Sequence, residues 1–417
     1  MRQDWNYVPL SKACLIKPPK SEARQRLHQS DLVSFVPMSD LGIREKFFSS
    51  MEEKPFGKVS GSYTYFADDD VLLAKITPCF ENGKLGIARG LVNGVGFGSS
   101  EFIVFRPSGE LASEFLFYYL SQDGFRDAGQ RVMSGAVGHK RVSKEFIENH
   151  LIPLPPLAEQ KRMVAILDEA FEGIDAAIAN TEKNLANAQE LLESYLSSVF
   201  SRSSQDYPQK PLSDISTFSS GGTPSKRNDT FWCGDIPWVS GRDMKSTQLF
   251  DSQLHISVSA VAGSSTRIAP IGSLLILVRG MGLAHGAQVA ELMVACAFNQ
   301  DIKGVHPKSD LVPRYLVFAL RHKINSSENI LSNAAHGTLK INSEGLKNVL
   351  VPIPCIEKQN EIVTAIEALK LGIQHLESIY QRKLLALAEL KQSLLQKAFS
   401  GALTSEMPDK QQKEAVA

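Results

Sequence analysis

Cysteine is scarce in this sequence, and no two cysteines are spaced as a C-x-x-C pair. The five thiols stand far apart along the 417 residues, at Cys14, Cys79, Cys233, Cys296 and Cys355. This spacing supports neither a disulfide framework nor a zinc site built from cysteines. We therefore expect a protein of the reducing cytoplasm.

Long apolar runs are also missing. No window approaches the ~20 uncharged apolar residues that a membrane-spanning helix needs. The first ten residues, MRQDWNYVPL, lack the apolar stretch of a signal peptide. Hydrophobic residues still make up 43% of the chain and charged residues 22%, as in ordinary globular proteins. We expect two or three folded domains and no membrane contact.

The chain carries no net charge, because its 45 basic residues balance 45 acidic ones. The net charge is +1 over residues 1–156, −4 over 157–202, +3 over 203–355 and zero over 356–417. A nucleic-acid-binding surface must therefore be a local patch, or be completed by the charge of a partner.

Most catalytic signatures are absent. The chain contains no P-loop, no H-E-x-x-H zinc motif and no G-x-S-x-G nucleophile motif. The stretch RGMGLAHG at residues 279–286 has the glycines of a dinucleotide loop at the wrong spacing. The acidic run Asp68–Asp70, followed by Lys75, leaves open a metal-dependent nuclease site. A solvated turn explains it better, because the corresponding residues 269–272 in the second half of the chain contain no acid.

What the sequence does contain is a long internal repeat. The stretch LIPLPPLAEQKRMVAIL, beginning at Leu151, returns as LVPIPCIEKQNEIVTAI, beginning at Leu350. Five further segment pairs precede it and keep the same order at an offset of about 200 residues, such as DVLLAKI at Asp70 with GSLLILV at Gly272. Chance does not explain this order, so the chain is one unit written twice.

Each repeat has two parts with different periodicities. The first part mixes short β-rich runs, such as EFIVFRP and LLILV, with glycine-rich turns and short helices, which predicts a mixed α/β (α+β) domain. The second part has apolar residues at alternating spacings of three and four over about 45 residues, which predicts a coiled-coil helix. The expected seam of the first helix includes Leu157, Gln160, Leu167, Ile174, Thr181 and Ala188, and that of the second includes Ile366, Leu376 and Leu390.

The Pro-x-Pro segments mark where each globular domain passes into its long helix, because proline is tolerated in a first helical turn. We expect the second helix to return antiparallel along the first, giving two similar heads related by a pseudo-two-fold axis. The predicted boundaries are a first domain at 1–156, a helix at 157–202, a second domain at 203–355, a helix at 356–402 and a flexible tail at 403–417.

Two sets of polar loops suit binding to DNA. The loops GHKRVS and GTLKIN occupy corresponding places, with Arg141 aligned to Lys340 and Ser143 to Asn342 as predicted N-caps of a following helix. Longer polar loops follow the strands DVLLAKI and GSLLILV, and their side chains differ between the repeats. Asn, Arg and Lys can bind phosphates or base edges. The candidate DNA contacts are Lys75, Thr77, Asn82, Lys84, His139, Lys140, Arg141, Arg227, Arg242, Arg279, His336 and Lys340.

These motifs together resemble the specificity subunit of type I restriction–modification enzymes. The resemblance rests on GGTPSKRNDTFWCGDIPWVSGRDM, on DVLLAKITPCFENGKLG with SSEFIVFRP, and on the repeated G-x-x-(R/K) loop followed by P-x-P-x-x-x-x-Q and a long helix. It covers residues 1–402. In the second repeat, Leu339 stands where the first repeat has Lys140, and Cys355 stands where the first repeat has a proline.

The resemblance implies a protein that recognises DNA without being an enzyme itself. Each head would be a target recognition domain that reads one half of a split double-stranded DNA sequence, and the helices would set the spacing. Two methyltransferase (modification) subunits would dock on the helices, and motor-nuclease restriction subunits would join them. S-adenosylmethionine, Mg²⁺ and ATP would bind to those partners and not to this chain.

Two other classes remain open from the residues. One is a free-standing tandem nucleic-acid-binding protein, which would not co-purify with a methyltransferase. The other is a metal-dependent nuclease that uses Asp68–Asp70, which would cleave DNA with Mg²⁺ on its own.

Overall fold

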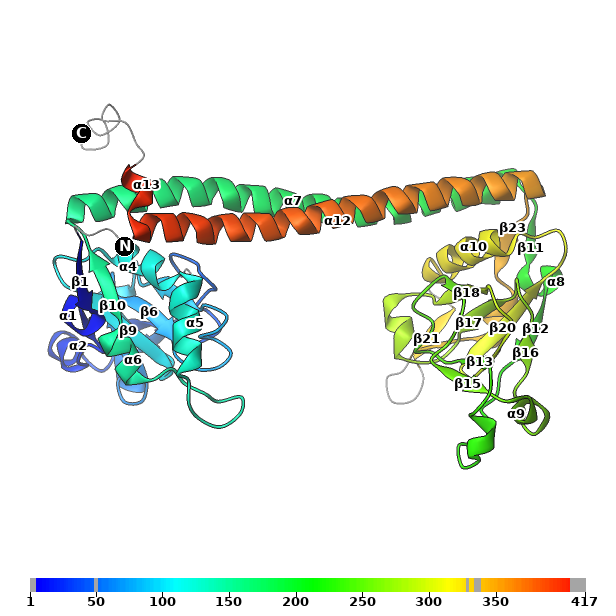
Figure 1. The fold of residues 1–417 in the computed structure, drawn as a ribbon, viewed down its shortest axis with the longest axis horizontal. Helices are drawn as coiled ribbons and strands as arrows, with labels where there is room; N and C mark the ends of the chain where they lie inside the picture. The colour runs from blue at the N-terminus through cyan, green and yellow to red at the C-terminus, as the bar shows by residue number, and fades with distance from the viewer. Residues whose placement is uncertain (1–4, 49–51, 328–329, 334–338, 406–417) are drawn as a thin grey trace. The chain divides into compact units, whose positions relative to one another are not determined.

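The computed structural model describes residues 5–48, 52–327, 330–333 and 339–405. The chain divides into two units, each of which contains parts of both long helices. Unit 1 comprises Met1–Thr181 with Arg382–Ala417, and unit 2 comprises Glu182–Gln381. Figure 1 shows the elements of each unit in ribbon form.

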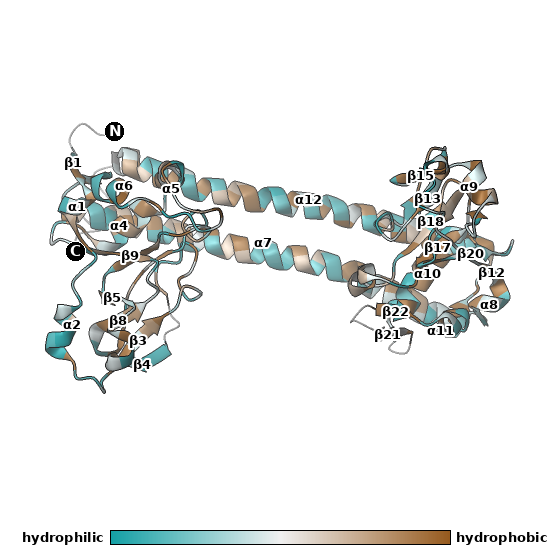
Figure 2. Ribbon diagram, turned by 90° about the horizontal axis from the view of Figure 1, so that it is seen from below, coloured by the Kyte–Doolittle hydropathy of each residue, from teal (hydrophilic) through white to brown (hydrophobic). Residues whose placement is uncertain are grey.

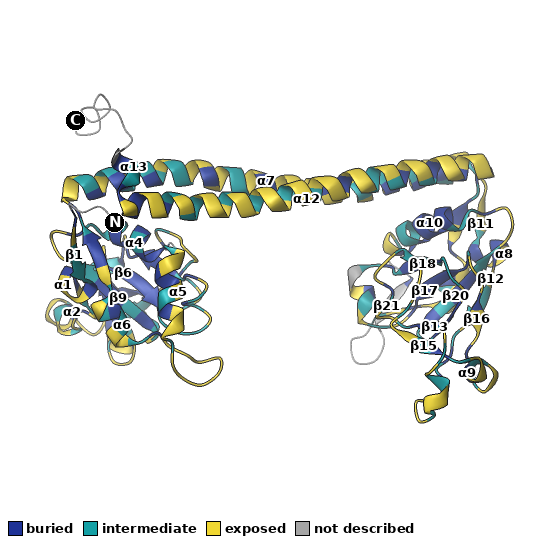
Figure 3. Cartoon of the chain, in the orientation of Figure 1, coloured by how far each residue is buried: buried dark blue, intermediate teal, exposed yellow. Residues whose placement is uncertain are grey.

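Unit 1 contains two four-stranded sheets. The first is antiparallel, in the order β2-β9-β6-β7, with strands Cys14–Ile16, Phe102–Pro107, Val71–Ala74 and Leu85–Ile87. The second has the order β4-β3-β8-β5, with strands Glu52–Pro55, Leu32–Val36, Val95–Gly98 and Thr64–Ala67. In it β3 and β8 run parallel, and the other neighbours are antiparallel. The strands are short and rich in buried Val, Leu and Phe, as the sequence predicts (Figure 3).

Short helices surround these sheets. They are α1 Leu10–Ala13, α2 Ser21–Arg26, α3 Phe56–Val59, α4 Ser113–Leu120, α5 Asp123–Arg131 and α6 Lys144–Asn149, with the 3-10 turn η1 at Val92–Gly94. Helix α4 is buried almost all round, because it packs between the first sheet and the long helices.

Unit 2 repeats this plan, which confirms the predicted doubling. Its sheets have the orders β12-β20-β17-β18-β14 and β15-β13-β19-β16, and β13 and β19 run parallel where unit 1 has β3 and β8. The strands are β12 Ser216–Ser220, β13 Ile236–Val239, β14 Gln248–Leu249, β15 Leu254–Ile256, β16 Ile268–Ala269, β17 Leu274–Leu277, β18 Val289–Leu292, β19 Cys296–Phe298 and β20 Ile302–Pro307. The helices are α8 Leu212–Ile215, α9 Val258–Ala262, α10 Pro313–Asn325 and α11 Ser343–Lys347, with 3-10 turns η2 Asp229–Phe231 and η3 Met281–His285.

A two-stranded pairing closes each unit beside its long helix. In unit 1, β1 (Asn6–Pro9) pairs with β10 (Leu151–Leu154), and in unit 2, β11 (Gln209–Pro211) pairs with β23 (Leu350–Pro352), both antiparallel. The first proline of each Pro-x-Pro segment, Pro153 or Pro352, therefore lies in a strand, and the second, Pro155 or Pro354, lies in the short link before the helix.

The long helices are α7 (Leu157–Asp206) and α12 (Ile356–Ser400). Along α7 the buried residues recur every seven positions, at Gln160, Leu167, Ile174, Thr181 and Ala188, and brown and teal alternate along both helices in Figure 2. The helices run antiparallel in each unit. Lys391 makes an ion pair with Asp175 in unit 1, and Gln189 donates to Glu377 at 3.2 Å in unit 2. The predicted coiled-coil pair is confirmed.

Some predicted seam residues are more exposed than expected. Leu157, Leu376 and Leu390 are 40%, 39% and 45% exposed. An α-helix turns every 3.6 residues, so its apolar stripe drifts by about 20° per heptad away from a strict seven-residue repeat.

Helix α7 continues to Asp206, past the expected end at 202. The expected tail begins with a short helix, α13 (Ala402–Ser405), and residues 406–417 lie outside the described residues.

A glutamine fixes each domain to its long helix. The buried Gln160 side chain accepts a hydrogen bond from the Ala112 N–H at 2.9 Å and donates to the carbonyls of Glu110 and Pro155, both at 2.8 Å. Gln359 does the same in unit 2 with the Val312 N–H and the carbonyls of Asp310 and Pro354. The glutamine of P-x-P-x-x-x-x-Q therefore ties the start of the long helix to the segment before α4 or α10.

Replacing Gln160 with alanine should destabilise unit 1 by about 2–4 kcal/mol, because three buried backbone groups lose their partner. Thermal or urea unfolding of the purified chain measures this loss. Gln189→Ala is the matched control and should cost less than about 1 kcal/mol, because its single contact is exposed. Equal losses for both variants would contradict the anchoring role of Gln160.

Carboxylates on the long helices add a second tie. Asp168 on α7 accepts hydrogen bonds from Lys46 Nζ at 2.6 Å and from the Tyr118 hydroxyl. At the corresponding place on α12, Glu367 pairs with Arg314 of α10, whose guanidinium also donates to the Thr247 carbonyl at 2.8 Å. Burial and the Asp168 carboxylate raise the pKa of Tyr118, which therefore stays protonated as the donor.

Across the described residues, none of the helices has the length and apolar character needed to span a bilayer.

Candidate nucleic-acid interface

The two loop sets singled out from the sequence meet in unit 1. The Val142 N–H donates to the Lys75 carbonyl, and the Thr77 N–H donates to the Lys140 carbonyl, both at 2.9 Å. The segment after β6 is thus joined by backbone hydrogen bonds to the segment before α6. Lys75, Thr77, Lys140 and Arg141 come together although about 65 residues of sequence separate the two segments.

The second segment forms a protruding loop, residues 134–141, which we call the finger. Its ends are pinned because Ser134 and Arg141 exchange two backbone hydrogen bonds, at 3.1 and 2.9 Å. Gly138, at φ +79°, allows the tight reversal that the tip requires. Val137 at the tip is 93% exposed, and His139 and Lys140 beside it are also exposed.

Arg141 itself is engaged within the protein. Its guanidinium makes two hydrogen bonds of 2.8 Å with the two carboxylate oxygens of Glu101. This contact raises the pKa of Arg141 and lowers that of Glu101. The pair holds the root of the finger against the turn between β8 and β9, and a phosphate would have to displace Glu101 to reach the charge.

The other candidates in unit 1 differ in exposure. Lys84 donates its ammonium group to the carbonyls of Met38 and Ser39, at 2.7 and 3.3 Å, so it holds a turn of the backbone. The Thr77 hydroxyl donates to Glu81 at 2.8 Å. Asn82 is exposed at the outer end of this loop.

Unit 2 joins its loops in the same way. The Ile341 N–H donates to the Val278 carbonyl at 2.9 Å, and the Gly280 N–H donates to the Leu339 carbonyl at 3.2 Å. Arg279 therefore lies across an antiparallel bridge from Lys340. Lys340 belongs to β22 (Leu339–Ile341), which pairs with β21 (Leu331–Asn333).

Two arginines of unit 2 share one hollow. Arg242 and Arg279 line a hollow of about 360 Å³ together with Asn299 and Asp301. Arg227 is exposed in the turn before η2 and does not line this hollow. His336 lies outside the described residues.

The predicted N-caps are confirmed. Ser143 Oγ accepts from the Phe146 N–H at 3.1 Å, and Asn342 Oδ1 accepts from the Glu344 N–H at 3.1 Å. The capped helices α6 and α11 have only six and five residues. Helix α6 follows the finger and α11 follows β22. Both helices are too short to offer much of a helix dipole to a phosphate.

The acidic run is used inside the protein. Asp68 accepts from the Leu91 N–H at 3.0 Å, Asp69 pairs with Arg89, and the buried Asp70 receives two hydrogen bonds of 2.7 Å from Arg106. Among the described side chains, no group of three or more His, Cys, Asp or Glu is placed to hold a metal ion. These contacts do not fit the ligand set that the nuclease alternative requires.

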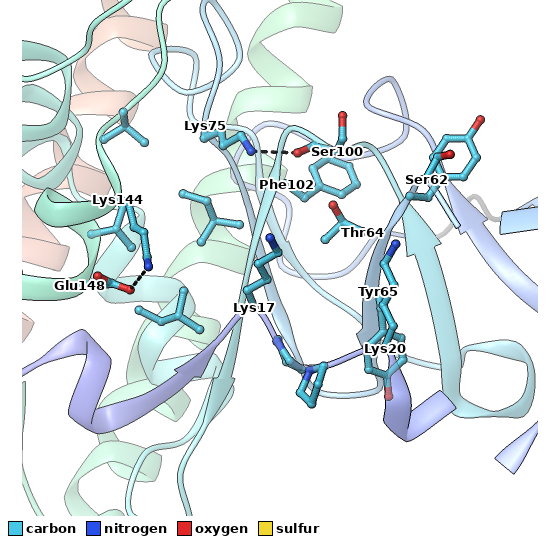
Figure 4. Close-up of a pocket in the computed structure, with 17 residues that line it drawn as sticks. Lys17, Lys20, Ser62, Thr64, Tyr65, Lys75, Ser100, Phe102, Lys144 and Glu148 are labelled. Carbon is cyan, nitrogen blue, oxygen red and sulfur yellow. Dashed lines mark hydrogen bonds and ion pairs between the residues drawn. The ribbon is translucent and has the colours of Figure 1, made fainter. Parts of the chain in front are cut away.

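The structure adds basic residues that sequence analysis did not single out. Lys17, Lys20 and Lys144 line one hollow of about 660 Å³ together with Lys75 (Figure 4). The only local signal in the sequence is KPPK at residues 17–20, where two prolines stiffen a turn between two lysines.

The chain has two α/β domains built on the same plan, and each domain continues into a long helix. The two long helices pair antiparallel. This architecture is the one expected of a two-domain DNA specificity protein. Residues 52–187 and 205–382 match the family model of the type I restriction modification DNA specificity domain. The chain belongs to this family.

Named relatives agree with this assignment. The chain is 36% identical over 198 residues to the type I restriction enzyme EcoEI specificity subunit of Escherichia coli, covering 47% of this chain and 33% of that protein. It is 32% identical over 241 residues to the EcoR124I/EcoR124II specificity subunit of Escherichia coli, covering 55% and 58%. The matched regions thus span from one third to somewhat over half of these relatives.

Solved structures share the fold. A structure from work on complex assembly and conformational transition of the type I R-M system superposes with a TM-score of 0.78 at 20% identity, over 97% of this chain and 99% of that chain. The HsdS subunit from Thermoanaerobacter tengcongensis gives a TM-score of 0.62 at 20% identity, over 97% and 98%. At this identity the likeness concerns the fold alone.

Proposed function

We propose that this chain is the DNA-recognition subunit of a type I restriction–modification complex, in which each unit reads one half of a bipartite duplex target. One observation carries the proposal. Both units join the same two loops with the same pair of backbone hydrogen bonds, yet the side chains on those loops differ. Unit 1 has Lys75, Ile76 and Thr77 where unit 2 has Val278, Arg279 and Gly280. One scaffold with two sets of side chains suits the reading of two different half-sites.

The chemistry belongs to partners in this proposal. Two modification subunits dock on the helix pair and methylate DNA with S-adenosylmethionine, and motor-nuclease subunits that use ATP and Mg²⁺ join for cleavage. This chain contributes recognition without a catalytic residue and works in the cytoplasm. The engaged carboxylates Asp68–Asp70 support this division of labour, because they fit internal hydrogen bonds better than metal ligation.

Exchanging residues 1–150 for the equivalent segment of another family member should change one half of the methylated sequence and leave the other half unchanged. Unit 1 carries its own cores and its own loops, so its specificity should transfer with it. Methylome sequencing of a host that carries the hybrid and its modification subunit measures the result.

The reciprocal exchange of residues 203–350 is the matched control and should change only the other half. Change in both halves after a single exchange would contradict independent reading. A chain that binds DNA but never co-purifies with a methyltransferase would instead support a free-standing DNA-binding protein.

A further inference from the structure

Unit 1 contains a hollow lined by four lysines, and three of them are replaced by other residues at the matching described positions of unit 2. The hollow of about 660 Å³ lies where β2, at the edge of one sheet, faces β5, at the edge of the other, with α6 beside them (Figure 4). Its charged lining residues are four lysines and one acid: Lys17, Lys20, Lys75, Lys144 and Glu148. We call it the lysine hollow.

The lysines come from separate parts of the chain. Lys17 and Lys20 follow β2, Lys75 follows β6, and Lys144 begins α6. Glu148 lies 3.3 Å from Lys144, and Glu101, 4.0 Å from Lys75, already binds Arg141. Unit 1 has almost no net charge, so four cations against one lining acid make a local positive patch.

Lys17 occupies the centre of this patch. Figure 4 shows its side chain in the middle of the hollow, between Lys144 and Thr64. Within the described residues no hydrogen bond or ion pair occupies its ammonium group. Its backbone has φ +59°, a left-handed conformation that disfavours residues other than glycine, asparagine and aspartate. A lysine held at such a position is a pattern found at binding sites.

Lys20 lies in the same region of excess positive charge as Lys17. Lys20 Nζ donates to the Gly61 carbonyl at 2.7 Å. Burial and the nearby cations Arg24 and Lys17 lower the pKa of Lys20. An anion in the hollow would relieve this repulsion.

Unit 2 has no lysine at the positions that match Lys17, Lys75 and Lys144. In unit 1, Lys75 also donates to the Ser100 carbonyl at 2.9 Å. The strand registers place Ser219 where unit 1 has Lys17, because Cys14 pairs with Pro107 as Ser216 pairs with Pro307. Val278 takes the place of Lys75, and Ser343 takes that of Lys144, each at the same step of the fold. Unit 2 does place Lys303 where unit 1 has the lining residue Ile103, but the Lys303 ammonium group donates to Ser220 Oγ at 2.6 Å. The lysines at positions 17, 75 and 144 are therefore particular to unit 1.

We propose that the lysine hollow holds the sugar–phosphate backbone of one strand of duplex DNA, with Lys17, Lys75 and Lys144 as phosphate contacts. The proposal rests on the DNA-recognition function above and adds where unit 1 grips the duplex. Val142 lines the hollow and directly follows Arg141 at the root of the finger, so a strand lying in the hollow brings the finger next to a groove. Tyr63, Phe102 and Ile103 supply an apolar wall for the sugars.

The test measures how DNA affinity depends on salt, using the complex of this chain with its modification subunits. Lys17→Gly and Lys144→Ala should each lower the slope of log K against log salt by about 0.9, and the triple variant with Lys75→Ala by about three. The loss should be equal on target and non-target duplexes, because phosphates carry no sequence. Lys12→Ala is the matched control, since Lys12 is exposed on α1 outside the hollow, and it should leave the slope unchanged.

Thermal unfolding shows whether each variant is folded, so that a change in the salt slope can be assigned to lost phosphate contacts. Lys17→Gly should not lower Tm, because glycine adopts φ +59° without strain. A triple variant that folds and keeps the wild-type slope would overturn the proposal, and so would one that loses only target specificity. A wild-type complex that does not bind duplex DNA at all would instead contradict the proposed function.

Discussion

Inserting three heptads into each long helix is expected to lengthen the spacer of the methylated DNA target by about nine base pairs. Each residue adds ~1.5 Å of helix, so 21 residues add ~32 Å. Duplex DNA rises ~3.4 Å per base pair and completes a turn in about 34–36 Å. The two half-sites would therefore return to nearly the same face of the duplex.

The insertion points follow from the register of the helix pair. Gln189 faces Glu377, so a segment inserted after Asn187 has its partner after Ser378. Buried residues recur every seven positions along α7, and whole heptads therefore keep the apolar seam facing inward. Methylome sequencing reads the new spacing directly.

Two control insertions distinguish a change in the distance between the half-sites from a general disruption of the helix pair. One inserted heptad adds ~10 Å, about three base pairs, and rotates the half-sites out of alignment, so methylation should fall more than with three heptads. Four residues in α7 alone shift its seam against α12, as a stutter does, and should impair assembly. A three-heptad variant that still methylates the original spacing would show that the helices do not set the distance.

Much of the fold was predictable because the sequence repeats. Segments in one order at one offset predicted two domains of one topology, and the heptad pattern predicted the antiparallel helices. Both patterns can be read directly from the sequence, because neither depends on knowing which distant residues are in contact. Gln160 illustrates the limit. Its seven-residue spacing marked it as a seam residue, but its hydrogen bonds to Ala112 and Glu110 depend on a segment about 50 residues away.

The candidate site was less predictable because charge in a loop does not reveal its partner. Arg141 and Lys84 looked like free cations in the sequence, yet Glu101 and the Met38 carbonyl engage them. The lysine hollow was missed for the converse reason. Its lysines belong to three separate segments, and only the folded edges of two sheets bring them together.

Arg106 is expected to be the most costly charged residue to remove from unit 1. Its guanidinium donates two hydrogen bonds of 2.7 Å to Asp70, whose side chain is 1% exposed, and it also pairs with Glu22. Among the described residues, Arg106→Met would leave the buried carboxylate with the Ala67 N–H, at 2.8 Å, as its hydrogen-bond donor. Such a loss costs about 3–5 kcal/mol. Urea unfolding should show it.

Arg89→Met is the matched control. Arg89 pairs with Asp69 and Glu114 at half-exposed positions, where such pairs contribute about 0–1 kcal/mol. Similar losses in the two variants would contradict the special status of the Arg106–Asp70 pair.

The pH dependence of Arg106→Met gives an independent check on the cause. Burial raises the pKa of Asp70, and the hydrogen bonds from Arg106 oppose that rise. Without Arg106 the folded-state pKa rises further above its unfolded value, so the folded state binds a proton that the unfolded state has lost. The contribution of this protonation to the free energy of unfolding is present at low pH and is lost as the pH rises through the folded-state pKa of Asp70. The deficit relative to wild type should therefore be larger at about pH 7.5 than at about pH 5. A deficit that does not change with pH would mean that Arg106 acts through packing and not through the charge of Asp70.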